Sequence, residues 1–142
     1  NEATDVFVRD LTAGTTTRVS VGTGGLEANG ESTDPSISSD GRYVAFASDA
    51  ENLVAGDHNW ARDVFVRDRT AATTTRVSVN TSASSPNADS NRPSISGDGR
   101  YLAFTSTATD LVPNGLNGVF VRDRARFCAY LEDDLRETQG LR

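Results

Sequence analysis

The chain is patterned in short apolar runs separated by turn residues. Residues 42–48 and 100–106 are rich in aromatic and β-branched side chains, and they are apolar at consecutive positions. Such runs are typical of strands that are covered on both faces. Asp-Gly pairs at 40–41 and 98–99 precede them and favour tight hairpin turns. The pattern therefore predicts short antiparallel strands joined by tight turns.

The same pattern occurs more than once along the chain. Residues 5–48 align with residues 63–106 at a constant offset of 58, and 29 of the 44 aligned positions are identical. A third, partial copy begins at residue 118, only 55 residues after residue 63, because the preceding loop is three residues shorter. Tandem copies at a fixed period predict a repeat architecture in which each unit packs on its neighbours.

Each repeat predicts a four-stranded antiparallel meander. The first strand begins with Pro35, a position that suits proline because it lacks a backbone donor. The second strand covers 42–48, and the third and fourth, at 63–69 and 73–79, are dense in Val and Thr. A four-stranded sheet that is buried on both faces and repeated in tandem is the blade of a β-propeller. We therefore expect an all-β fold of tandem blades over residues 1–123.

A longer motif carries a resemblance to a known family. The sequence Pro-Ser-Ile-Ser-x-Asp-Gly-Arg-Tyr-(Val/Leu)-Ala-Phe, followed by Asp-Val-Phe-Val-Arg-Asp, resembles the WD40-like (TolB-type, PD40) β-propeller repeat of bacterial proteins. The resemblance covers residues 1–123 and implies a propeller fold and an extracellular or periplasmic location. It indicates little about activity, because propellers serve as binding modules, enzymes and scaffolds alike.

The number of strands does not fit a closed propeller. The chain contains the third and fourth strands of one blade, four strands of the next, and the first three of another. Propellers typically have about 4 to 8 blades, so this chain alone would leave apolar faces and unpaired edges. We expect a homo-oligomer, most simply a trimer with a composite ring of six blades. The strand at 119–123 then competes with residues 5–10 for one blade position.

Residues 124–142 depart from the repeat. Phe127, Leu131 and Leu135 recur at four-residue spacing and Gly140 follows them, which predicts a short C-terminal helix over residues 125–139. This helix could cap an exposed blade edge or could join chains by association. A chance sequence downstream of a frameshift or truncation is the third interpretation.

Composition argues against two classes of partner. The 142 residues suffice for one modest domain, and the formal net charge of −6 repels nucleic-acid phosphates and anionic lipid headgroups. No stretch approaches the about 18 consecutive apolar residues that a membrane-spanning helix needs. We therefore expect neither nucleic-acid binding nor insertion into a membrane.

The chain has few residues for nucleophilic catalysis. His58 and Cys128 are the single histidine and the single cysteine, and no Gly-x-Ser-x-Gly motif is present. The sequence therefore predicts a module that is not an enzyme and that binds protein or glycan. The alternatives are a propeller fragment of a larger secreted hydrolase or peptidase, and a purely structural repeat that self-assembles.

The rim loop before residue 63 carries the strongest candidate for ligand chemistry. Oxygen atoms of Asp57, Asn59 and Asp63 could converge on a hard cation such as Ca²⁺. The same residues could instead form an Asx turn that caps the following strand. His58 and Trp60 lie between them and are candidate ligand-binding residues, because an exposed aromatic side chain can contact a glycan or a peptide.

Overall fold

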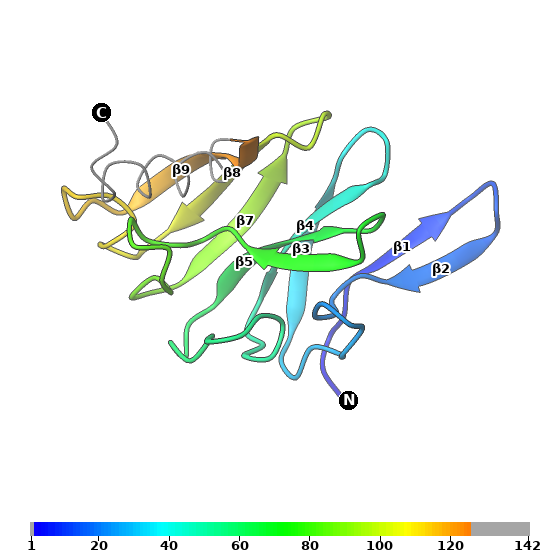
Figure 1. Cartoon of the computed structure of the whole chain (residues 1–142), viewed down its shortest axis with the longest axis horizontal. Helices are drawn as coiled ribbons and strands as arrows, with labels where there is room; N and C mark the ends of the chain where they lie inside the picture. The colour runs from blue at the N-terminus through cyan, green and yellow to red at the C-terminus, as the bar shows by residue number, and fades with distance from the viewer. Residues whose placement is uncertain (1, 126–142) are drawn as a thin grey trace, which may run out of the picture.

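The computed structural model describes residues 2–125 of the chain. All strand pairs in that range are antiparallel. The strands are β1 (Phe7–Asp10), β2 (Thr15–Arg18), β3 (Ser32–Ile37), β4 (Tyr43–Ser48), β5 (Asp63–Asp68), β6 (Thr73–Arg76), β7 (Ser90–Ile95), β8 (Tyr101–Ser106) and β9 (Gly118–Asp123). They form an N-terminal hairpin, β1-β2, a central sheet, β3-β4-β5-β6, and a C-terminal sheet, β7-β8-β9 (Figure 1). The all-β class with antiparallel sheets is confirmed.

The three sheets do not close a ring within residues 2–125 (Figure 1). The helix predicted over 125–139 falls, from residue 126 onward, outside the described residues, as does Cys128. Within the described range, no helix has the length and apolar character that crossing a membrane requires.

Tight turns join the first two strands of each unit. Gly41 has a φ of +71°, a conformation that glycine adopts without strain. The Asp40 carboxylate accepts hydrogen bonds from the Ser38 hydroxyl at 2.6 Å and from the Arg42 backbone N–H at 3.0 Å. Residues 98–99 repeat this geometry between β7 and β8. The repeated aspartates at these positions therefore fix the hairpins.

The central sheet is buried on both sides. On the side facing the N-terminal hairpin, here called the N-facing side, Phe46 and Phe65 stack with ring centroids 5.9 Å apart. They pack with Val44 against Val6 and Val19, which flank the hairpin strands. Burying each side chain of this size contributes about 1.5–3 kcal/mol. The hairpin is thus held to the central sheet by an apolar interface.

The opposite, C-facing side of the central sheet packs against the C-terminal sheet. Val64 and Val66 of β5 join Ile95, Leu102 and Phe104 in a second buried cluster. Because β5 alternates between its two sides, its valines point one way and its phenylalanine the other. Neighbouring sheets therefore share apolar interfaces in the manner expected of consecutive blades.

Hydrogen bonds fix how β7 crosses the central sheet. The backbone N–H of Ile95 donates to the Ser36 hydroxyl at 3.0 Å, and the N–H of Ser90 donates to the carbonyl of Arg62 at 2.7 Å. An equivalent bond joins the central sheet to the N-terminal hairpin, where the Ser32 N–H donates to the Thr4 carbonyl at 2.8 Å. The hairpin therefore meets β3 as β5 meets β7.

Candidate functional site

The rim loop at 56–63 brings two carboxylates into the interior. Asp57 is almost entirely buried, and Asp63, the first residue of β5, has no exposed surface. Gly56 has a φ of +75°, which permits the turn immediately before Asp57. An unpaired carboxylate is very costly to bury, so the environment of these two groups must supply partners.

Arg76, at the end of β6, is the positively charged partner of both carboxylates. Its Nη1 atom lies 2.7 Å from Asp57 Oδ1 and 3.5 Å from Asp63 Oδ2. The Ser78 hydroxyl donates to Asp63 Oδ1 at 2.6 Å and accepts the Val64 N–H at 2.9 Å. We call Asp57, Asp63, Arg76 and Ser78 the buried acidic cluster.

Burial controls the protonation of this cluster. It raises the pKa of Asp63 to about 6, against the opposing effects of Ser78, Asn59 and Arg76. Burial also raises the pKa of Asp57, although the Arg76 charge acts in the opposite direction. Two neighbouring carboxyl groups disfavour a second negative charge. The cluster therefore takes up a proton at mildly acidic pH.

The three residues predicted to bind Ca²⁺ meet at the start of β5. Asn59 donates its amide N–H to Asp63 Oδ2 at 3.0 Å, and its Oδ1 accepts the Ala61 N–H at 3.3 Å, the contact of an Asx turn. Arg76 supplies the positive charge beside Asp57 and Asp63. No group of three or more His, Cys, Asp or Glu side chains is arranged for a metal ion in residues 2–125. Ca²⁺ binding stays a prediction, and the ion would compete with the guanidinium.

The two candidate ligand-binding residues of the loop lie on the surface. His58 is exposed, and the Trp60 side chain is 87% exposed. Trp60 also has a φ of +56°, in the left-handed region that bulky residues rarely occupy. The loop thus presents an indole ring on the rim, and glycan or peptide binding there stays a prediction.

A partial version of the buried acidic cluster lies beside the N-terminal hairpin. The Ser20 hydroxyl donates to Asp5 Oδ1 at 2.6 Å and accepts the Val6 N–H at 3.1 Å. Arg18 places Nε 3.5 Å from Asp5 Oδ2 and Nη1 2.6 Å from the exposed carboxylate of Glu27. The arrangement of acid, hydroxyl and arginine therefore recurs with the repeat.

Two members of the cluster were not predicted from the sequence. Arg76 and Ser78 follow β5 by a full strand, so their spacing from Asp57 and Asp63 does not resemble a local motif. A signal was nevertheless present, because arginine and serine recur one repeat earlier, at residues 18 and 20. Both copies contain the aspartate, the arginine and the serine at the same spacing, so Arg76 and Ser78 could have been recognised as partners of Asp63.

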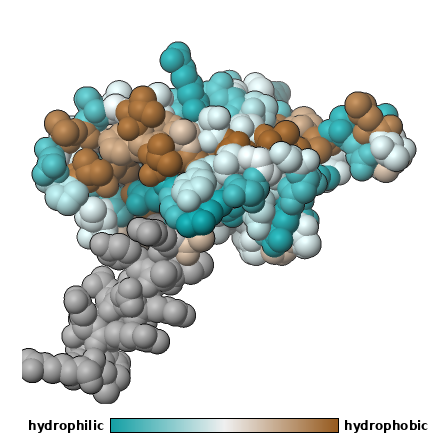
Figure 2. All heavy atoms as spheres, turned by 90° about the horizontal axis from the view of Figure 1, so that it is seen from above, coloured by the Kyte–Doolittle hydropathy of each residue, from teal (hydrophilic) through white to brown (hydrophobic). Residues whose placement is uncertain are grey.

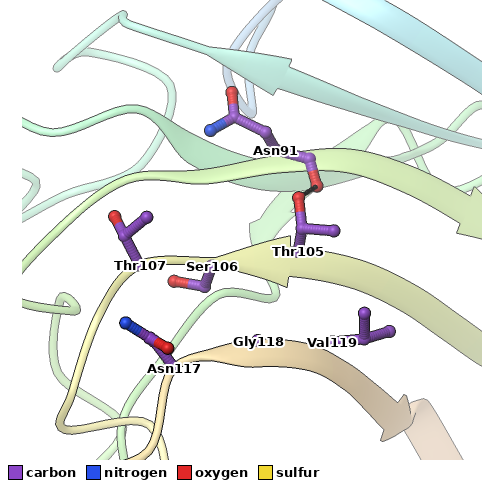
Figure 3. Close-up of a pocket in the computed structure, with 7 residues that line it drawn as sticks. All are labelled: Asn91, Thr105, Ser106, Thr107, Asn117, Gly118 and Val119. Atoms are coloured by element: carbon purple, nitrogen blue, oxygen red, sulfur yellow. Dashed lines mark hydrogen bonds between the residues drawn. The ribbon is translucent and has the colours of Figure 1, made fainter.

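The third repeat lacks two side chains that lie at the start of β5 in the second repeat. Gly118 stands in place of Asp63, and Asn117 stands in place of Arg62, whose guanidinium is paired with Asp49 at 2.7 Å. A groove of about 310 Å³ lies at the corresponding position in the C-terminal sheet (Figure 3). Its lining residues are Asn91, Thr105, Ser106, Thr107, Asn117, Gly118 and Val119.

An apolar surface adjoins the groove. Val119 is 75% exposed, whereas its counterpart in the central sheet, Val64, is fully buried. Val121 is exposed as well, whereas its counterpart Val66 is buried. Figure 2 shows hydrophobic residues gathered at the end of the molecule that carries β9. We call the groove together with the two valines of β9 the C-terminal face.

A second apolar surface lies toward the other end of the molecule. Phe7 is 52% exposed, whereas its counterpart Phe65 is fully buried. Ile37 of β3 is 49% exposed, whereas its counterpart Ile95 is 9% exposed because it packs on the central sheet. Phe7 lies on the side of the hairpin that faces away from the central sheet, and Ile37 lies on the N-facing side of the central sheet. We call Phe7 and Ile37 the N-terminal face.

Comparison with known proteins gives a structural neighbour. The chain is similar to the crystal structure of TolB from Acinetobacter baumannii, with 19% sequence identity and a TM-score of 0.47. The match covers 84% of this chain and 24% of the TolB chain, so this chain spans a minor part of that protein's length. No protein-family model matches the chain, and no similar sequence was found among curated proteins. Membership of the WD40-like repeat family stays a prediction.

Proposed function

We propose that this chain is a non-catalytic propeller-type module that binds protein through the apolar faces at its two ends. The observation that carries the proposal is the exposure of Val119 and Val121, whose counterparts in the central sheet are covered by the next sheet. Soluble proteins rarely leave a contiguous apolar surface uncovered unless it serves an interaction. The C-terminal face is therefore the principal binding surface.

A structural role for the buried acidic cluster supports the non-catalytic part of the proposal. Asp57 and Asp63 are closed off from solvent and are compensated by Arg76 and Ser78. A catalytic carboxylate must reach its substrate, and neither of these groups is accessible. The partial repetition of the cluster at Asp5 also favours a structural device that joins neighbouring strands of one sheet.

The partner most consistent with these faces is another copy of the chain. The N-terminal and C-terminal faces differ from each other, so contacts between copies would be head to tail and could close into a ring. Three copies would give the composite ring of six blades that the repeat count predicts. An extracellular or periplasmic location, and a glycan or peptide contact at His58 and Trp60, are further parts of the proposal.

Sedimentation velocity on three proteins tests this function. The wild-type chain should show concentration-dependent association, and the double variant Phe7→Asp/Ile37→Asp, which alters the N-terminal face, should sediment as a monomer. Leu26→Asp is the matched control, because Leu26 is also a large exposed apolar residue but belongs to neither face. It should associate like the wild type. A wild-type chain that is monomeric at every concentration would overturn the proposal, as would a double variant that associates normally.

A further inference from the structure

The N-terminal hairpin and the C-terminal sheet carry the same strand sequence. Residues 6–10 and 119–123 both read Val-Phe-Val-Arg-Asp. β8 pairs with β9 so that Leu102 lies opposite Arg122 and Phe104 opposite Phe120. The central sheet uses the same register between β4 and β5. The edge of β8 is therefore as well suited to β1 as it is to β9.

β1 differs from β9 in its neighbouring strand and in the residue that precedes it. β1 is paired with β2, whose sequence Thr-Thr-Thr-Arg and register repeat those of β6 on β5. It is also preceded by Asp5, which the Ser20 hydroxyl bonds. β9 begins with Gly118, and no strand of residues 2–125 pairs with its other edge. A blade built with β1 and β2 would have four strands, whereas the blade built with β9 has three.

The exposed side chains of the N-terminal face fit a blade in which β1 of a second copy lies beside β8 in place of β9. Placed opposite Phe104, Phe7 of a second copy would take the position of Phe120, whose ring stacks on Phe104 at a centroid distance of 5.8 Å. Ile37 of that copy would then cross β7 as Ile95 crosses β3. The Ser94 hydroxyl could accept its N–H, as Ser36 accepts the N–H of Ile95.

We propose that the hairpin β1-β2 of a second copy replaces β9 at the edge of β8, and so completes a four-stranded blade shared between two chains. The inference rests on the proposed function, because it specifies how copies associate. Exchange buries Phe7 and Ile37, and it adds the β1-β2 strand pair to the sheet. It releases β9, whose two valines are already exposed and whose Phe120 gives up its place on Phe104 to Phe7, so the net apolar gain is the burial of Ile37. The balance of apolar burial therefore favours exchange.

Two engineered disulfides test the exchange in a Cys128→Ser background. Residues directly opposite in an antiparallel ladder have Cα atoms about 4.5 to 5.5 Å apart, within the range of about 4.4 to 6.8 Å that a disulfide usually spans. Ala103 lies opposite Val121 within the chain. After exchange it would lie opposite Val8 of the second copy, as Ala45 lies opposite Val66.

The variant Val8→Cys/Ala103→Cys should form covalent oligomers on oxidation. Within one chain these residues lie in different sheets with the central sheet between them (Figure 1). The locked variant, Ala103→Cys/Val121→Cys, ties β9 to β8 and should weaken association by about tenfold or more, equivalent to at least about 1.4 kcal/mol. Reduction of its disulfide should restore association.

The outcomes separate the inference from the proposed function. If the locked, oxidised variant associates as well as its Cys128→Ser parent, exchange is wrong although association through other contacts stands. If the parent itself is a monomer in native mass spectrometry, both the exchange and the proposed association fail. Covalent oligomers of the first variant, together with loss of association in the second, support exchange.

Discussion

The central sheet and the C-terminal sheet have closely similar sequences and different surroundings. In both, the third strand reads Val-Phe-Val-Arg-Asp and pairs with the second strand in the same register. Val64 is buried by the C-terminal sheet, whereas Val119 faces solvent. The local sequence thus determines the strand and its register, and the neighbouring sheet determines burial. Stability in this molecule belongs to pairs of adjacent sheets more than to single blades.

The comparison is sharpest for two equivalent phenylalanines. Phe65→Ala should lower the free energy of unfolding by about 3–5 kcal/mol, because it empties a fully buried position. Phe7→Ala should cost less than about 1 kcal/mol in the monomer, because half of that ring is already exposed. Urea denaturation at low protein concentration measures both. Equal losses would contradict the assignment of burial to neighbouring sheets.

The two arginines of the complete and partial clusters give the next largest contrast. Arg76→Met should destabilise the chain by about 3 kcal/mol, because it leaves the buried carboxylates without their positive partner. Arg18→Met removes a partly exposed pair with Asp5 and Glu27 and should cost about 0–1 kcal/mol. Thermal unfolding of both variants measures the contrast. A similar loss of stability from each variant would contradict the claim that burial makes the Arg76 ion pairs more important than those of Arg18.

The pH dependence of stability should separate two aspartates. The folded pKa of Asp63 is about 6, above its ordinary value of 3.8, so the folded chain binds more protons than the unfolded chain between these values. This contribution to stability is complete below about pH 4 and is lost as pH rises through about 6. The bond from Arg42 lowers the pKa of Asp68 to about 2, so its contribution is present above about pH 4 and is lost toward pH 2.

Urea denaturation at pH 4.5 and 7.5 checks the Asp63 contribution. Relative to Asp63→Asn, the wild type should lose about 1–3 kcal/mol between these two pH values. Most of the loss should fall around pH 6. A difference between the two proteins that stays constant, or that grows in favour of the wild type with rising pH, would contradict the raised pKa.

The smallest effect concerns the predicted Ca²⁺ site. Ca²⁺ at about ten times its dissociation constant would stabilise the folded chain by about 1.4 kcal/mol. The increase in Tm should be larger in Arg76→Gln, where the competing guanidinium is gone, and should vanish in Asp57→Ala. Thermal unfolding with and without Ca²⁺ measures this. Unchanged Tm values in both the wild type and Arg76→Gln would remove the calcium prediction.

Much of the fold was predictable because it is encoded locally. The Asp-Gly turns and the apolar runs at 42–48 and 100–106 predict hairpins, and the structure forms them at those positions. The division into two, four and three strands followed from the repeat alignment. Turn geometry and strand pairing depend on neighbouring residues, so a single sequence contains the necessary signal.

The candidate site was less predictable because its partners are distant in sequence. Asp57 and Asp63 were recognised by their spacing, but Arg76, which determines their environment, comes from another strand. The exposure of Val119 could be anticipated only from the strand count, since its own sequence matches that of buried Val64. Local spacing thus identified candidate ligands without indicating which group compensates their charge.

The central claim is that the faces exposed at the two ends of this chain are association surfaces for further copies. Native mass spectrometry of the wild-type chain in a volatile buffer with trace Ca²⁺ tests it most directly, because one spectrum gives both copy number and bound metal. The account predicts a discrete oligomer, most simply a trimer. A monomer at every concentration would contradict it and would mean that the two faces do not bind other copies.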